Sequence, residues 1–176
     1  MTNSWREPAH RVGSLHIFLY SKGTPSWIRS QSILRLSAPL QLAKAGIYPY
    51  AEHPDFDLLL FGYAVDGGPV EVVDLASRQT IPEEILAVLV DPDVIKWAYN
   101  ASFERVCLSA WLRRHRPELL SDGFLDPAQW RCTVVWSVYL GLPMSLDAVA
   151  TVLKLDVQKD GAGKKLIKQF LSLIHI

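Results

Sequence analysis

The sequence predicts an α/β fold in which helices flank a mixed sheet, and three observations lead to this class. The chain has 176 residues, 49% of them hydrophobic, which suits one cored domain and is too little for two ordinary ones. Apolar patterns of strand and helical period follow in the order strand, strand, helix, strand, helix, helix, helix. Turn and capping residues separate these segments. Such an order is typical of a strand layer covered by helices.

The first two strands are expected to form a hairpin. Residues 58–65 read Leu-Leu-Leu-Phe-Gly-Tyr-Ala-Val, which is a strand-like apolar run. Residues 66–69, Asp-Gly-Gly-Pro, can supply the positive φ angles of a tight turn. Residues 70–75 are then expected to form the returning strand.

A helix and a third strand are expected next. Pro82 suits a first helical position, because its missing N–H has no partner there in any case. The acids Glu83 and Glu84 favour the positive end of the helix dipole, so the helix is expected to run through about Val90. Residues 94–99 form the third expected strand.

The longest helix is expected to follow Asn100 and to run to about His115. Its apolar positions fall at i, i+3, i+4, i+7 and i+8, which describes one buried stripe. These positions are Phe103, Val106, Cys107, Ala110 and Trp111.

Two more helices complete the expected order. Asp126 and Pro127 form an N-terminal signal, and the residues after them are spaced for one face of a helix that ends near Gly141. The residues of that face are Trp130, Val134, Ser137 and Val138. Ser145 can cap a last helix through Leu153.

Charge and cysteine content limit the classes of protein. Lys+Arg and Asp+Glu balance at 18 each, so the global charge indicates neither a nucleic-acid nor a membrane partner. The two cysteines, Cys107 and Cys132, form no CxxC pair, so neither a disulfide framework nor a zinc site is expected. The apolar run at residues 15–20 is far too short to cross a bilayer. We therefore expect a soluble, cytoplasmic protein without a membrane partner.

Residues 1–37 differ from the rest of the chain. They show no sustained strand or helical period, and no Asp or Glu lies between Glu7 and Glu52, although five Lys and Arg residues fall in that gap. We expect an irregular segment here, either disordered or translated out of frame, ahead of a partial domain at residues 38–170.

Five blocks of sequence resemble the amino-terminal region of phage-type family A DNA polymerases. They are residues 45–57, 60–70, 96–108, 125–136 and 139–146. The resemblance implies a ribonuclease H-like domain, incomplete at both ends, from the proofreading 3′-to-5′ exonuclease of a DNA-directed DNA polymerase. It also implies the single-stranded 3′ end of a DNA primer as partner, and a polymerase domain in the same full-length chain.

In that family the exonuclease carries four acidic metal ligands in three sequence motifs. Two divalent ions generate the attacking hydroxide and stabilise the leaving 3′ oxygen of the primer. The resemblance therefore implies Mg²⁺ or Mn²⁺ as the cofactor of the complete domain, since hard oxygen ligands suit these ions.

The second motif of the family is matched by Asn100, Phe103 and Glu104. The resemblance implies that Asn100 and Phe103 contact the substrate strand and that Glu104 is a catalytic metal ligand. We expect Asn100 and Glu104 to share a cleft, because a strand end and a position one helical turn later can face one ligand. Many relatives have Asp at the position of Glu104, so the ligand is one methylene longer here.

Two structural roles stay open for the same residues. An acid in the first turn of a helix is favoured by the helix dipole alone, so Glu104 can be a solvated surface residue. Asn100 can be a plain N-cap, and a cap and a substrate contact are compatible with each other.

The other two motifs are missing. An Asp-x-Glu is expected shortly before Ser37, where residues 31–36 read Gln-Ser-Ile-Leu-Arg-Leu. The codons CAA-TCG-ATC-TTG-AGA-CTN would encode these residues and, read two bases later, Ile-Asp-Leu-Glu-Thr, so a frame error would explain the loss. The third motif lies well beyond the Gly-Lys-Lys-Leu-Ile block at residues 163–167. Residues 171–176 match a translated transposon-end sequence, so we expect a non-biological tail.

Several other features are interpreted as structural. Cys107 and His115 are too far apart on one helix for a nucleophile and its base. Residues 160–165 lack the spacing of a phosphate loop. The basic run at residues 113–116 can contact a DNA backbone or be a solvated helix end. Four tryptophans are expected mainly in the core, although one near the cleft can stack on a base. These are Trp97, Trp111, Trp130 and Trp136.

The first functional hypothesis is that the chain is an inactive fragment of a DNA polymerase with exonuclease activity. The alternative is a non-catalytic module of ribonuclease H-like fold that binds single-stranded DNA or acts as a scaffold. A stand-alone nuclease of the same fold is a third option. An Asp-x-Glu upstream and a Tyr and Asp downstream in the uninterrupted gene would favour the first.

Overall fold

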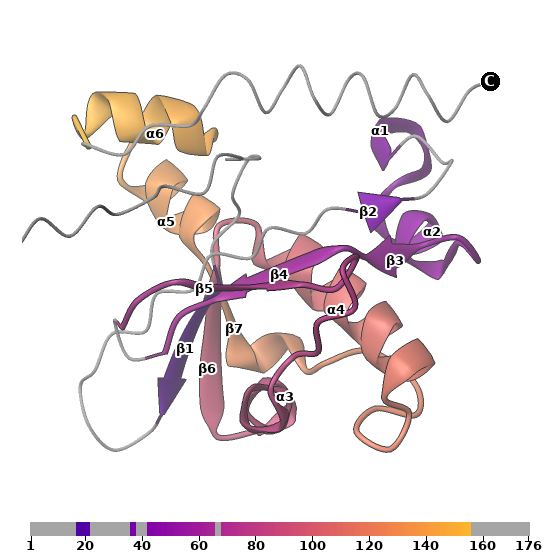
Figure 1. Ribbon diagram of the computed structural model, residues 1–176. Coiled ribbons are helices and arrows are strands. Elements are labelled where there is room, and N and C mark those ends of the chain that lie inside the picture. Colours follow the sequence, from indigo (N-terminus) through magenta and orange to yellow (C-terminus); the bar gives the residue numbers. More distant parts are fainter. Residues whose placement is uncertain (1–16, 22–35, 38–41, 66–67, 156–176) are drawn as a thin grey trace, which may run out of the picture.

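A computed structural model describes residues 17–21, 36–37, 42–65 and 68–155 of the chain (Figure 1). The strands are β1 (Ile17–Ser21), β2 (Leu36–Ser37), β3 (Asp57–Leu58), β4 (Leu60–Tyr63), β5 (Glu71–Asp74), β6 (Val94–Ala98) and β7 (Trp130–Cys132). The helices are α1 (Leu42–Ala45), α2 (Ile47–Glu52), α3 (Glu83–Val90), α4 (Ala101–His115), the 3-10 helix η1 (Pro127–Gln129), α5 (Thr133–Tyr139) and α6 (Leu146–Val152). No helix among the described residues is long and apolar enough to cross a membrane.

A mixed sheet is present, with three strands in the order β1, β6, β7, but only β6 was among its expected strands. β1 runs antiparallel to β6, with Ile17 opposite Ala98, and β7 runs parallel to β6, with Lys96 opposite Trp130. Two smaller antiparallel sheets, β2 with β3 and β4 with β5, accompany it. The structure is therefore α/β, with its strands divided among three sheets in the described part of the chain.

Most of the expected elements are confirmed. β4 and β5 form the expected hairpin, and α3, β6, α4 and α6 lie where the sequence patterns predict them. Ser145 caps α6, because its hydroxyl accepts a hydrogen bond from the Ala148 N–H at 3.1 Å. Gly141, with φ 71°, ends α5 as expected, and the N–H of Leu142 donates to the Ser137 carbonyl at 2.8 Å.

The helix expected after Asp126 is wrong in its first half. Asp126 does accept a hydrogen bond from the Ala128 N–H, at 2.9 Å, but the turn it caps is only the short η1. Trp130–Cys132 then forms β7, because β6 offers this segment a parallel backbone partner. The helix begins only at Thr133.

Residues 1–37, which we expected to be irregular, contribute β1 and β2 to the structure. The remaining residues of that segment lie outside the described part of the chain, as do residues 156–176. The expectations about residues 31–35, 160–165 and 171–176 therefore also fall outside it.

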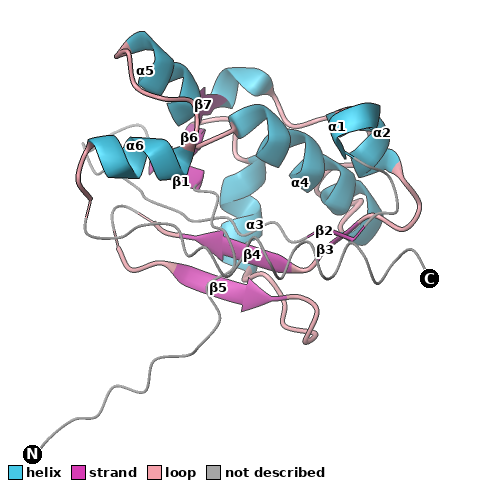
Figure 2. Cartoon of the chain, turned by 90° about the horizontal axis from the view of Figure 1, so that it is seen from above, coloured by secondary structure: helices cyan, strands magenta, loops and turns pink. Residues whose placement is uncertain are grey.

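The core forms around α4, which contacts α2, β3, β6 and β7. Its buried residues include Val106, Leu108 and Leu112, which have no exposed surface. Figure 2 shows α1 and α2 at one end of α4 and α5 and α6 toward the other. Trp111 and Trp130 are buried as expected, but the expectation for Trp136 is wrong, because its side chain is 55% exposed.

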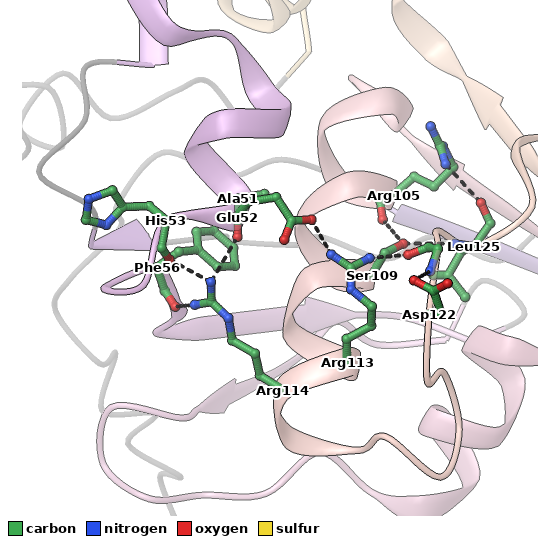
Figure 3. A network of polar contacts seen from close by, with 11 residues as sticks. Ala51, Glu52, His53, Phe56, Arg105, Ser109, Arg113, Arg114, Asp122 and Leu125 are labelled. Atoms are coloured by element: carbon green, nitrogen blue, oxygen red, sulfur yellow. Dashed lines mark hydrogen bonds and ion pairs between the residues drawn. The ribbon is translucent and has the colours of Figure 1, made fainter.

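The basic end of α4 contacts the protein itself, as Figure 3 shows. The Arg114 guanidinium donates to the carbonyls of His53, at 2.6 Å, and Phe56. Arg113 donates to Glu52 and to the Gly123 carbonyl. These arginines hold the end of α2 and the loop after α4 in place. Their guanidinium groups are therefore engaged within the fold, which disfavours the interpretation of this run as a DNA contact.

Candidate functional site

The candidate site lies where β6 ends and α4 begins. Asn100 occupies the N-cap position of α4, and its carbonyl accepts hydrogen bonds from the N–H groups of Phe103, at 2.8 Å, and Glu104, at 3.4 Å. Its side chain makes no capping hydrogen bond and is exposed. Asn100 is therefore an N-cap by position only, and its amide can contact a ligand from solvent.

Phe103 and Glu104 turn toward the interior from the first turn of α4. The Phe103 side chain is half-buried and packs against the core. The Glu104 side chain has no exposed surface, and neither of its carboxylate oxygens has a hydrogen-bond partner from another residue in the described part of the chain. Burial raises the pKa of Glu104 well above its usual value, although a hydrogen bond from its own backbone N–H lowers it in part, and nearby Cys132 adds a smaller increase.

The burial of Glu104 decides between two interpretations of this residue. A first-turn acid stabilised by the helix dipole alone would be solvated, and this carboxyl is not. A buried polar group without a partner costs about 1–3 kcal/mol, so this carboxyl does not stabilise the fold.

The carboxyl ends of β6 and β7 meet beside this carboxylate. Both strands run in the same direction, so they end at the same edge of the sheet. The hydroxyl of Thr133 donates to the Ala98 carbonyl at 3.3 Å, and the Val134 N–H donates to the Tyr99 carbonyl at 3.1 Å. The thiol of Cys132 also donates to the Tyr99 carbonyl, at 3.4 Å. These bonds fix the start of α5 against the end of β6.

Sequence reasoning missed two polar groups in this region. Cys132 influences Glu104 electrostatically from β7, and the ring nitrogen of Trp130, on the same strand, is buried without a hydrogen-bond partner. No spacing rule links residues 104 and 132. The signal that was available is the Asp-Pro pair at residues 126–127, which starts the chain on its return toward β6.

Asn100 and Glu104 lie on consecutive backbone turns but differ in exposure. One side chain is at the surface and the other is enclosed. A cavity of about 450 Å³ lies near the opposite end of α4, where Trp111, His115 and Asp57 contribute to its lining. A cleft shared by Asn100 and Glu104 therefore stays a prediction.

The described residues do not by themselves fit a two-metal site. They contain no group of three or more His, Cys, Asp or Glu side chains that could hold a metal ion. The unpartnered oxygens of Glu104 suit one ligand position. Further acidic ligands would have to come from outside the described residues, so no catalytic step through a metal follows from this arrangement.

The pair Cys107 and His115 is confirmed as structural. Cys107 is fully buried, and burial raises the pKa of its thiol far above the usual range. His115 instead stacks on Trp111, with ring centroids 5.0 Å apart, and its Nε2 lies 3.2 Å from an oxygen of Asp57.

Among known proteins, the DNA polymerase of Bacillus phage SP02 is similar to this chain. The two are 51% identical over 131 residues, which is 74% of this chain. No protein-family model and no solved structure matches the chain. The matched region makes up 19% of the phage polymerase. The chain is thus similar to about a fifth of the length of a phage DNA polymerase.

Proposed function

We propose that this chain is part of a DNA-directed DNA polymerase and belongs to its proofreading 3′-to-5′ exonuclease. The 51% identity to a phage DNA polymerase supports the polymerase part of this proposal, and the match of Asn100, Phe103 and Glu104 to the second motif of the family supports the exonuclease part. A match covering 74% of the chain has to include its central residues, and so Asn100 and Glu104. The buried, unpartnered carboxylate of Glu104 supports a role in chemistry there.

Each matched residue has a role in this proposal. Glu104 is a ligand for Mg²⁺ or Mn²⁺, and its enclosed position would keep competing water away from the ion. The exposed amide of Asn100 and the ring of Phe103 contact the single-stranded 3′ end of the primer. When bound, two such ions would supply the hydroxide and stabilise the leaving oxygen.

The chain as it stands is proposed to lack exonuclease activity. Two-metal hydrolysis depends on several carboxylates that act as a unit, and the loss of one commonly removes most of the activity. The described residues provide Glu104 without an accompanying cluster. Binding of single-stranded DNA does not require the metals, so weak, salt-sensitive binding is compatible with inactivity.

The test compares this 176-residue chain with the full-length protein expressed from the uninterrupted gene. Both are incubated with a labelled primer and Mg²⁺ or Mn²⁺. We expect the full-length protein to shorten the primer and the 176-residue chain not to. In the full-length protein, Glu104→Ala should lower the rate by about a hundredfold or more, since it removes a metal ligand.

The matched control is Glu84→Ala, which removes an exposed acid from the first turn of α3. Its rate should equal that of the unmodified protein. Shortening of the primer by the 176-residue chain, abolished by Glu104→Ala, would contradict the proposed inactivity. A full-length protein that binds the primer without shortening it would instead support the non-catalytic module.

A further inference from the structure

Helix α5 presents its large apolar side chains to solvent. Its buried residue is Ser137, which is 7% exposed and whose hydroxyl donates to the Thr133 carbonyl at 2.9 Å. An ordinary surface helix shows the reverse arrangement, with apolar residues inside and polar residues outside. The exposed residues of α5 and the turn after it are called the α5 face here: Val135, Trp136, Val138, Tyr139, Leu140 and Met144.

The residues of the α5 face are strongly exposed, and the next helix carries exposed apolar residues as well. Tyr139 is 88% exposed, and the other members are 50% to 69% exposed. Val152 and Leu153 of α6 are exposed as well, at 55% and 50%. Contiguous apolar surface of more than a few hundred Å² is rare on soluble monomers and marks an interaction site. Such a face is suited to the desolvated centre of a protein interface.

Charge indicates which kind of partner fits the face. The sequence has no Asp, Glu, Lys or Arg between Arg131 and Asp147. Binding to DNA draws on cations that neutralise phosphates, and membrane-surface helices commonly carry Lys or Arg on their polar side. The adjoining Arg131 donates to the carbonyls of Ala128, at 2.8 Å, and Trp130, at 3.1 Å, so its guanidinium is engaged. An uncharged apolar face therefore favours a protein partner.

We propose that the α5 face binds the part of the polymerase that lies outside this chain. This inference rests on the proposed function. The chain is similar to 19% of a phage polymerase, so most of such a protein lies elsewhere and is available as a partner within one polypeptide. A stable interface covers about 800 Å² on each partner, so the partner would contact more than α5 alone.

The proximity of the face to the candidate site gives the interface a consequence. The ring of Trp136 contacts that of Trp97 on β6, with centroids 5.7 Å apart, and α5 is hydrogen-bonded to the end of β6 beside Asn100. A partner seated on α5 therefore lies next to the strand end where the primer is proposed to bind.

Thiol labelling tests the proposal. Tyr139→Cys is introduced into a Cys132→Ser background, both in this chain and in the full-length protein from the uninterrupted gene. Cys107 is fully buried and should not react. The reaction of the new thiol should be slowed by about tenfold or more in the full-length protein, because the interface covers it. The matched control is Val72→Cys on β5, a site 49% exposed, which should react equally fast in both proteins.

Every other outcome overturns the proposal. Equal labelling of Tyr139→Cys in both proteins would mean that the face stays open. If the 176-residue chain is labelled more slowly at higher protein concentration, the partner is a second copy of the chain. If a single-stranded oligonucleotide protects the new thiol, the partner is nucleic acid. The labelling test and the activity test can fail independently of each other, because a full-length protein without polymerase or exonuclease activity can still protect position 139.

Discussion

Two buried ionisable groups, one in the middle of β6 and one just beyond its end, differ in their hydrogen-bond partners among the described residues. Lys96 has no exposed surface, and its Nζ donates to the Asp91 carbonyl at 2.5 Å and to Oε1 of Gln129 at 2.9 Å. Glu104, beyond the carboxyl end of the strand, is equally buried, and its oxygens have no partner from another described residue. The first arrangement is that of a structural group, and the second agrees with the role proposed for Glu104 in chemistry.

The comparison matters because the two groups carry opposite charges in one small core. Burial lowers the pKa of Lys96 to about 8, while the carboxylates of Asp91 and Asp126 partly oppose this change. Burial raises the pKa of Glu104, and no opposite charge compensates. Burial alone therefore does not distinguish a functional residue from a structural one, and the role proposed for Glu104 draws on burial without a described partner.

The largest expected effect is a gain in stability from Glu104→Met in the 176-residue chain. Methionine keeps a similar volume and removes a polar group that has no partner. The free energy of unfolding should rise by about 2 kcal/mol, the cost of such a group. Urea denaturation measures this directly. A loss of stability would mean that the carboxylate has partners and that the comparison with Lys96 is wrong.

Lys96→Met should have the opposite sign and a smaller size. It leaves the Asp91 carbonyl and the Gln129 amide oxygen without their donor, although it also removes a charge whose burial is unfavourable. We expect a loss of about 1–2 kcal/mol in the free energy of unfolding, because orphaned acceptors cost more than the charge relieves. Lys154→Met, at an exposed position just after α6, serves as the control and should change little. Equal stability of both variants would show that Lys96 contributes nothing.

The sequence predicted one side of this comparison better than the other. Lys96 lies two residues from Val94 and two from Ala98, so all three side chains point to the same, buried face of β6. Strand periodicity could therefore have predicted that this lysine is buried. The burial of Glu104 depends on β7, whose three residues are too short to show alternation. Trp130 also falls at helical spacing with Val134, and this spacing hid the strand.

Long-range pairing explains the other errors as well. The strand β7 forms because the chain returns to β6, where Trp130 pairs with Lys96 and the preceding Gln129 accepts a hydrogen bond from the Lys96 amine. Local propensity cannot predict a contact between residues so far apart in sequence. The elements with long local patterns, α3, β6 and α4, could be predicted because burial and periodicity agree within each of them. The exposed Trp136 could not, since a tryptophan on an uncovered face and one in a core look alike in sequence.

The smallest expected effect concerns pH. The pKa of Lys96 falls from 10.5 to about 8 on folding, so between pH 8 and pH 10.5 the unfolded chain binds more protons than the folded one. Stability contributed by this group therefore rises with pH across that window, and the penalty for its charge is fully present below pH 8. The tyrosines Tyr50 and Tyr63, whose pKa values are raised to about 12, oppose this rise above pH 10. We expect a gain of about 1 kcal/mol between pH 8 and pH 10, less than the full shift in pKa implies because this window covers only part of the range between the two pKa values. Urea denaturation at pH 7, 8, 9 and 10 measures it, with Lys96→Met as the variant in which the rise should disappear. A rise of the same size in Lys96→Met would assign the rise in stability to another group. It would also mean that burial of the Lys96 charge has no measurable cost.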